Sequence, residues 1–207
     1  MEAQAKVGIW YSLGRGVEQN YTESFKWSLR AAQQGSAKAQ FITGTLFFYG
    51  FGIEKDYKCA LEWFEKAADK QYPEAFLFLG HMLLNGLGVK QNYCKAAQYY
   101  TQAVQAGVVD AKNDLAMLYI MGWGVKQDFD KAFILLNEAC EKKEFFTLQN
   151  NLAFLYFHGL GTVQDYAKAF NLYQTAAPES IEAKAALGVM YYKGLGVPEN
   201  YAQAVAY

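Results

Sequence analysis

The chain is poor in the residues that most often build catalytic, metal and disulfide sites. Its 207 residues include two histidines, three prolines and three cysteines, which are Cys59, Cys94 and Cys140. The cysteine count is odd and no two cysteines stand in a C-x-x-C spacing, which argues against a disulfide framework and against a zinc site. We therefore interpret the cysteines as buried free thiols that pack like small hydrophobic side chains, and we expect neither a metal nor a cofactor.

The chain also lacks long apolar runs and an excess of either charge. No apolar stretch reaches the roughly 18 residues of a membrane span, and the first residues contain Glu2 and Lys6 without the apolar centre of a signal peptide. There are 19 basic and 20 acidic residues, with no basic stripe. We therefore expect neither membrane insertion nor a nucleic-acid partner. These features favour the cytoplasm, while a periplasmic or secreted location stays open if the chain is a fragment.

Glycine, by contrast, is abundant and occurs in pairs at a fixed interval. Successive pairs are 36, 36, 36, 37 and 35 residues apart. They are Gly14/Gly16, Gly50/Gly52, Gly86/Gly88, Gly122/Gly124, Gly159/Gly161 and Gly194/Gly196. A fixed period of about 20–50 residues indicates stacked supersecondary units. Such units bury their apolar faces against one another and build binding surfaces more often than catalytic pockets.

Each unit has the pattern helix, glycine loop, helix. Apolar residues at helical spacing precede each pair, and the first glycine suits the left-handed residue that ends a helix. The position of Gly44 holds a small residue in every unit, which indicates that another helix backbone crosses close by. After each pair an Asn or Asp predicts the N-cap of a second helix. These residues are Asn20, Asp56, Asn92, Asp128, Asp165 and Asn200.

The second helix repeats a small, a large and a small residue at spacings of three and four, which places them on one helical face. The large residues are Trp27, Trp63, Tyr99, Leu135, Leu172 and Tyr207. We predict an all-α fold, a single solenoid of about six helix-turn-helix repeats over residues 1–207. The predicted repeats are 1–35, 36–71, 72–107, 108–143, 144–179 and 180–207, the last of them incomplete. The fifth departs most, with one extra residue within 142–150 and with Leu148 where an alanine is expected.

This pattern resembles the Sel-one-like repeat, a relative of the tetratricopeptide repeat. The closest matches are KCALEWFEKAA at 58–68 and GVKQNYCKAA at 88–97, and the resemblance covers essentially the whole chain. It implies a right-handed α/α superhelix with the first helices on the concave side. It also implies an adaptor role, since such repeats commonly bind proteins or peptides.

Catalytic interpretations are weaker. The glycine pairs follow a helix and lack a Lys-Ser/Thr, so they do not make a phosphate loop. His81 and His158 lie two units apart, and no H-E-x-x-H or G-x-S-x-G motif occurs. A Cys–His nucleophile stays open, because such pairs are close in space and not in sequence. Some relatives with cysteine-rich repeats are linked to β-lactam or cell-wall chemistry, and a hydrolase of this type is the alternative, although the chain lacks their paired cysteines.

A stripe of variable residues remains on each first helix once the recurring core positions are subtracted. It is rich in aromatic and methionine side chains, as partner surfaces are, although curvature of the solenoid would bury part of it, Phe48 and Phe157 first. Asn113 and Asn150 hold equivalent positions and are expected to clamp backbone amides of a partner. The predicted partner-binding residues are Lys38, Phe41, Phe48, Tyr49, Leu77, His81, Asn85, Asn113, Met117, Met121, Asn150, Phe154, His158 and Tyr192.

The predicted function is a non-enzymatic scaffold or adaptor that binds a protein or peptide in a concave groove. One concrete version is a bacterial regulator or an inhibitor of an effector or toxin. The incomplete last repeat and the uncovered first one also predict end-to-end self-association.

Overall fold

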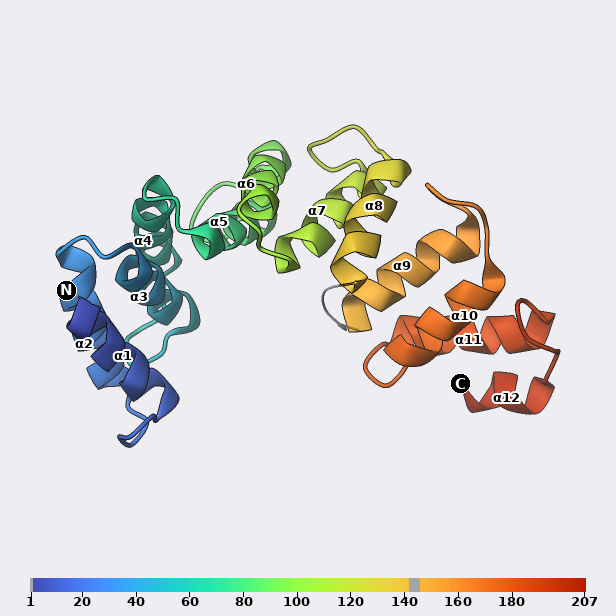
Figure 1. Ribbon diagram of the computed structural model, residues 1–207, viewed down its shortest axis with the longest axis horizontal. Helices are drawn as coiled ribbons and strands as arrows, with labels where there is room; N and C mark the ends of the chain where they lie inside the picture. The colour runs from blue at the N-terminus through green and yellow to red at the C-terminus, as the bar shows by residue number, and fades with distance from the viewer. Residues whose placement is uncertain (1, 142–145) are drawn as a thin grey trace. The chain divides into compact units, whose positions relative to one another are not determined.

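The computed structural model describes residues 2–141 and 146–207, which form twelve helices and no strand (Figure 1). The first helices of the repeats are α1 (Glu2–Leu13), α3 (Ala37–Tyr49), α5 (Pro73–Asn85), α7 (Asp110–Met121), α9 (Phe146–His158) and α11 (Ile181–Lys193). The second helices are α2 (Tyr21–Gln33), α4 (Tyr57–Asp69), α6 (Tyr93–Gln105), α8 (Phe129–Cys140), α10 (Tyr166–Ala176) and α12 (Tyr201–Ala206). The predicted all-α fold of helix pairs is confirmed.

The helices gather in two compact units, Met1–Val108 with α1 to α6 and Val109–Tyr207 with α7 to α12. Within each unit a first helix packs on the second helix of its own repeat, and that second helix packs on the next first helix. The single solenoid and its repeat boundaries stay predictions. No helix in the described residues is both long and apolar enough to cross a bilayer.

The predicted helix ends are confirmed. All six Asn and Asp caps accept a hydrogen bond from a backbone amide in the first turn of the second helix that they precede. Gly50, Gly86, Gly122 and Gly194 are left-handed C-caps of first helices. Each of these glycines donates its N–H to the carbonyl oxygen four residues earlier, which satisfies a group that the ending helix would leave unpaired.

The core lies one residue further along the second helices than the repeated large residues indicate. Trp27, Trp63, Tyr99, Leu135 and Leu172 are half-buried. The residue after each of them is buried, and these residues are Ser28, Phe64, Tyr100, Leu136 and Tyr173. Each second helix is therefore rotated so that the first residue of the two lies at the edge of the interface and the second points into it.

The small position of the first helix faces this buried residue. A Cβ atom on Gly44 would lie 2.8 Å from the ring of Phe64 and 3.3 Å from the carbonyl oxygen of Ala60. On Gly80 it would lie 2.4 Å from the ring of Tyr100. The predicted close approach of a helix backbone is present, but the nearest neighbour is an aromatic side chain that fills the space a Cβ would occupy.

The interpretation of the cysteines as buried thiols was wrong for Cys94, which is exposed, and only half right for Cys59 and Cys140, which are half-buried. Cys94 is the second residue of α6 and lies on the solvent side of its first turn. Burial raises the pKa of Cys140 to about 11, so this residue is a neutral thiol at pH 7.

In the fifth repeat Leu148 is 1% exposed within the core, and the predicted irregular turn at 142–145 lies outside the described residues.

Replacing Gln71 by glycine is expected to raise the free energy of unfolding by about 0.5–1 kcal/mol. Gln71 has a φ of 59°, in the left-handed region, whereas Gly35 and Gly107 fill the equivalent positions of the neighbouring repeats. A non-glycine residue is strained there, and Gln71 is exposed, so its side chain offers little packing in return. Urea unfolding followed by circular dichroism measures the effect.

Gln34→Gly is the matched control, because Gln34 lies in an equivalent turn with a φ of −81°. Glycine there relieves no strain, adds freedom to the unfolded chain and removes the exposed hydrogen bond that Gln34 donates to Gln4, so it is expected to destabilise. Stabilisation by both substitutions, or by neither, would contradict the assignment of strain to Gln71.

Candidate functional site

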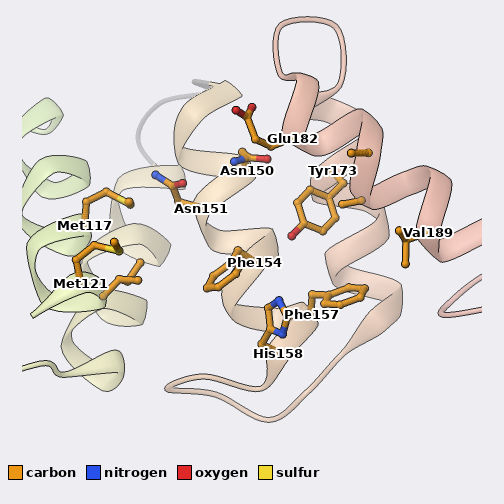
Figure 2. A pocket seen from close by; sticks show the side chains of 13 residues that line it. Met117, Met121, Asn150, Asn151, Phe154, Phe157, His158, Tyr173, Glu182 and Val189 are labelled. Atoms are coloured by element: carbon orange, nitrogen blue, oxygen red, sulfur yellow. The ribbon is translucent and has the colours of Figure 1, made fainter.

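A cavity of about 520 Å³ lies on the second unit, among α7, α9, α10 and α11 (Figure 2). Its volume is within the range of ligand pockets, about 300–1,000 Å³. The lining residues are Met117, Ile120, Met121, Asn150, Asn151, Phe154, Phe157, His158, Tyr173, Glu182, Ala185, Ala186 and Val189. Helical spacing explains the convergence, because residues three, four and seven apart on α7, α9 and α11 project from one face of each helix.

A more polar cavity of about 810 Å³ adjoins the first and shares Met117, Asn150, Asn151 and Glu182 with it. The remaining lining residues are Asn113, Phe146, Thr147, Glu179 and Ser180. We call the two cavities together the α7–α11 groove. It has an apolar part beside Met121, Phe154 and Val189 and a polar part beside Asn113 and Ser180.

Hydrogen bonds tie the polar side chains of the groove to one another. Asn151 donates its amide to Asn113 Oδ1 at 2.9 Å. The Ser180 hydroxyl lies 3.3 Å from Asn150 Oδ1 and 3.0 Å from Glu182 Oε2, so it has two acceptors for one proton. In the described part of the chain the side-chain NH₂ groups of Asn113 and Asn150 donate to no acceptor. These two NH₂ groups are therefore able to donate hydrogen bonds to acceptors on a bound molecule.

The apolar part of the groove presents large side chains to solvent. Met121 is 49% exposed, Val189 43% and Phe154 37%. The ring of Phe154 lies 4.5 Å from that of His158, centroid to centroid, and the ring of Phe157 lies 4.9 Å from it. Clustered exposed methionine and aromatic side chains are typical of protein-binding surfaces.

Two ionisable groups of the groove are shifted in opposite directions. The backbone amide of Glu182 and then the Ser180 hydroxyl lower the pKa of the Glu182 carboxyl, so it is ionised at pH 7. Burial raises the pKa of Tyr173 to about 12, so its phenol keeps its proton. The groove therefore offers a fixed negative charge at one wall and a neutral hydroxyl at another.

The predicted site residues of the second unit meet in this groove, with one exception. Asn113, Met117, Met121, Asn150, Phe154 and His158 line one or both cavities. Tyr192 is 60% exposed and lines a separate cavity between α11 and α12. Asn113 accepts a hydrogen bond from Asn151, and the clamping of a partner's backbone by Asn113 and Asn150 stays a prediction.

The predicted site residues of the first unit divide into exposed and packed ones. Lys38, Tyr49 and Asn85 are exposed. Leu77 is only 8% exposed, so it packs in the core and offers no surface to a partner. Phe41, Phe48 and His81 are half-buried. Phe41 and Phe48 contact Phe64, with centroids at 5.7 and 6.3 Å, and His81 contacts Phe78 and Tyr100.

Several groove residues were missed by the sequence reasoning. Glu182, Ala185 and Val189 hold the same repeat positions as Lys38, Phe41 and Thr45. Extending the stripe to the sixth repeat would therefore have found them. Tyr173 has no such signal, because it lies on a second helix at a position that its neighbours fill as core.

The described residues do not bring a catalytic constellation together. They contain no cluster of three His, Cys, Asp or Glu side chains that could hold a metal ion. His158 faces two phenylalanine rings, and no cysteine lines the groove around it. What the groove can do chemically is bind, through exposed apolar surface, amide donors and carboxylates.

Comparison with known proteins yields a family and several structural relatives. The family model described as Sel1 repeat matches residues 2–36, 37–72, 73–108, 109–143, 148–177 and 181–207. A Sel1 repeat protein from Oxalobacter formigenes is 33% identical, with a TM-score of 0.86 over 99% of this chain and 82% of that one. The protective antigen c5321 of uropathogenic Escherichia coli, which has an SLR fold, is 30% identical. Its TM-score is 0.85, over 99% of this chain and 44% of that one.

A more distant neighbour is the immunity protein PA5088 from Pseudomonas aeruginosa. It is 20% identical with a TM-score of 0.59, over 98% of this chain and 82% of that one, which shows a shared fold alone. No curated protein matches the chain.

Proposed function

The chain belongs to the Sel1 repeat family, whose members are generally protein-interaction scaffolds, and from that premise we propose that it binds a segment of a partner protein in the α7–α11 groove. The observation that carries the proposal is the exposure of Met121, Phe154 and Val189 beside a cavity of about 520 Å³. Solvent-exposed apolar side chains around a hollow cost free energy that a partner's apolar side chain recovers on binding.

The polar part of the groove supports an extended peptide as the occupant. The amide groups of Asn113 and Asn150 are available to donate to backbone carbonyl oxygens, and Glu182 to accept from a backbone N–H or a cation. An extended strand carries both kinds of group along its length. The groove therefore suits a segment that places one or two apolar side chains beside Phe154 and runs its backbone past the asparagines.

The proposal includes a finer version, in which the partner is a bacterial effector or toxin that the chain regulates or inhibits. The neighbour named an immunity protein shares the fold alone, at 20% identity, so its role does not carry over to this chain. No observation in the described residues favours the hydrolase alternative.

Phe154→Ala is expected to weaken binding of groove ligands about tenfold, because Phe154 is an exposed aromatic side chain at the centre of the apolar part. Short random peptides displayed on phage would be selected on the full chain, and the enriched sequences would be measured by fluorescence polarisation. Since 37% of Phe154 is exposed, the variant should keep its melting temperature within a few degrees.

Ile134→Ala is the matched control, because Ile134 is a 54% exposed apolar residue of α8 in the same unit that does not line the groove. If both substitutions weaken binding equally, or if Phe154→Ala has no effect on binding, the binding surface lies elsewhere and the proposal is wrong.

A further inference from the structure

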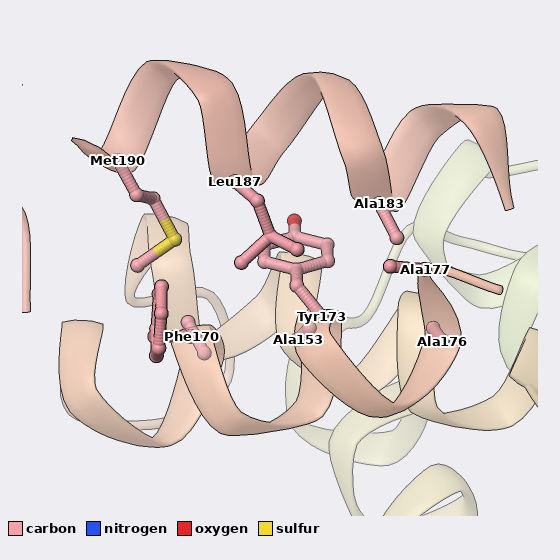
Figure 3. Packing of buried hydrophobic residues seen from close by; sticks show 9 residues of the cluster. Ala153, Phe170, Tyr173, Ala176, Ala177, Ala183, Leu187 and Met190 are labelled. Atoms are coloured by element: carbon pink, nitrogen blue, oxygen red, sulfur yellow. The ribbon is translucent and has the colours of Figure 1, made fainter. Parts of the chain in front are cut away.

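Tyr173 combines deep burial with a hydroxyl group that faces the groove. The residue is 5% exposed and packs in the core beside Leu187 of α11 (Figure 3). Nevertheless it lines the cavity, and Figure 2 shows its oxygen on the cavity side. No residue of the described ranges hydrogen-bonds this hydroxyl. The hydroxyl is not among the fully buried polar atoms, so it is open to the cavity, where water or a bound molecule can hydrogen-bond it.

Packing alone does not explain a tyrosine here. The equivalent positions of the second, third and fourth repeats hold Phe64, Tyr100 and Leu136, each 0% exposed. A hydrocarbon side chain thus fills the position in two of those three repeats. The hydroxyl of Tyr173 is an addition that the core does not require, and its place at the cavity wall gives it a use in recognition.

The charges of the groove all have one sign. Glu179 and Glu182 are exposed carboxylates of its lining, and neither a lysine nor an arginine lines either cavity. Glu182 lines both cavities, so a ligand in the apolar part is still close to its charge. An acidic ligand would be repelled and a basic one attracted.

We propose that the α7–α11 groove recognises a lysine or arginine side chain of the partner segment. Its methylene stem lies along Phe154 and its cationic tip is held by the Glu182 carboxylate, while the Tyr173 hydroxyl hydrogen-bonds another polar group of the same segment. Long basic side chains cover apolar surface with their stems while their tips keep polar partners. The carboxylate accepts the hydrogen bonds that an ammonium or guanidinium group donates, and the phenol can donate to or accept from the backbone of the segment. This inference rests on the proposed function, since it names the chemistry of the segment that the groove binds.

Selection of random short peptides on the full chain tests the proposal, and the composition of the enriched peptides is its readout. Wild-type protein is expected to enrich peptides with Lys or Arg next to an apolar residue. Against such a peptide, Glu182→Gln should weaken binding about tenfold and reduce its salt dependence, because the attraction is charge-assisted. Tyr173→Phe should weaken it about threefold to tenfold through one lost hydrogen bond.

Two control variants separate recognition from stability. Glu199→Gln changes an exposed carboxylate of the same unit that lines neither cavity, and Tyr166→Phe removes a hydroxyl from the same helix as Tyr173. Both should bind as the wild type does. Circular dichroism melts check that every variant is folded, and Glu182→Gln keeps the test decisive if Tyr173→Phe destabilises the core.

The outcomes distinguish this inference from the proposed function. Enriched peptides that depend on Phe154 but carry acidic or neutral side chains would overturn the basic-residue inference and leave peptide binding in place. Equal effects of Glu182→Gln and Glu199→Gln would also overturn it. If no enriched peptide depends on Phe154, the proposed function itself fails.

Discussion

Phe64→Ala is expected to lower the free energy of unfolding of the first unit by about 4 kcal/mol, whereas Trp63→Ala should cost about 1–2 kcal/mol. Phe64 is 0% exposed, and its ring contacts Phe41, Phe48 and Phe78, with centroids at 5.7, 6.3 and 5.0 Å. Removing the ring opens a cavity beneath Gly44, which has no side chain to fill it. Neighbouring rings are held by helices on both sides, so they relax only in part.

Comparing the free energies of unfolding of Phe64→Ala and Trp63→Ala tests which of these two adjacent residues is buried. Trp63 is the larger side chain, but it is half-buried, and Lys66 lies over its ring at 4.2 Å from the centroid. Urea unfolding followed by far-ultraviolet circular dichroism reports both variants without relying on tryptophan fluorescence. A greater loss from Trp63→Ala than from Phe64→Ala would mean that α4 is rotated relative to the structure described above.

Much of the fold was predictable because it depends on local chemistry. A glycine that must adopt a left-handed conformation and an Asn or Asp that must cap a helix are dictated within a few residues, so Gly50 and Asp56 could be assigned from the sequence. The rotation of each helix about its axis is not local. Trp63 and Phe64 are adjacent and both aromatic, and only the packing of three helices decides which of them is buried.

The small residues of the first helices also show that packing between helices cannot be predicted from local sequence. The recurrence of glycine at Gly44 and Gly80 indicated a close neighbour, and the sequence could not say which. The structure identifies it as the ring of Phe64 or Tyr100. A small residue on one helix and a large one on its partner act as a pair that is separated by about 20 residues of sequence, which a periodic pattern does not reveal.

The candidate site was half predictable for a related reason. When the core positions of the first helices were subtracted, the remaining residues of α7 and α9, including Met117 and Phe154, were those that line the groove. The same procedure also selected Leu77, which is buried. Subtraction assumes that each residue belongs either to the core or to the surface. Tyr173 belongs to both, with its ring in the core and its hydroxyl at the cavity, and it lies on a second helix, where the subtraction was not applied.

The second glycine of four pairs has a role that the sequence did not reveal, and it leads to the other large expected effect. A Cβ atom on Gly52 would lie 2.2 Å from the carbonyl carbon of Tyr21 and 2.5 Å from the amide nitrogen of Thr22. Equivalent clashes occur at Gly88 with Tyr57, at Gly161 with Phe129 and at Gly196 with Tyr166. The glycine loop of one repeat therefore rests on the backbone at the start of the second helix of the repeat before it. Backbone atoms cannot turn aside as a side chain can, so only glycine allows this contact.

Gly52→Ala is accordingly expected to destabilise the first unit by at least about 3 kcal/mol, from the sum of left-handed strain and a forced separation of two repeats. Gly16→Ala separates the two terms, because Gly16 has a φ of +73° against +72° for Gly52 but nothing within 4 Å of its Cβ position. It carries the conformational strain alone and should cost about 1 kcal/mol. Both substitutions lie in the same unit, so one urea titration of each, followed by circular dichroism, compares them directly. Equal losses would show that backbone conformation, and not the contact between repeats, is the reason for the second glycine. A larger loss at Gly52 would show that these residues set how closely successive repeats can pack.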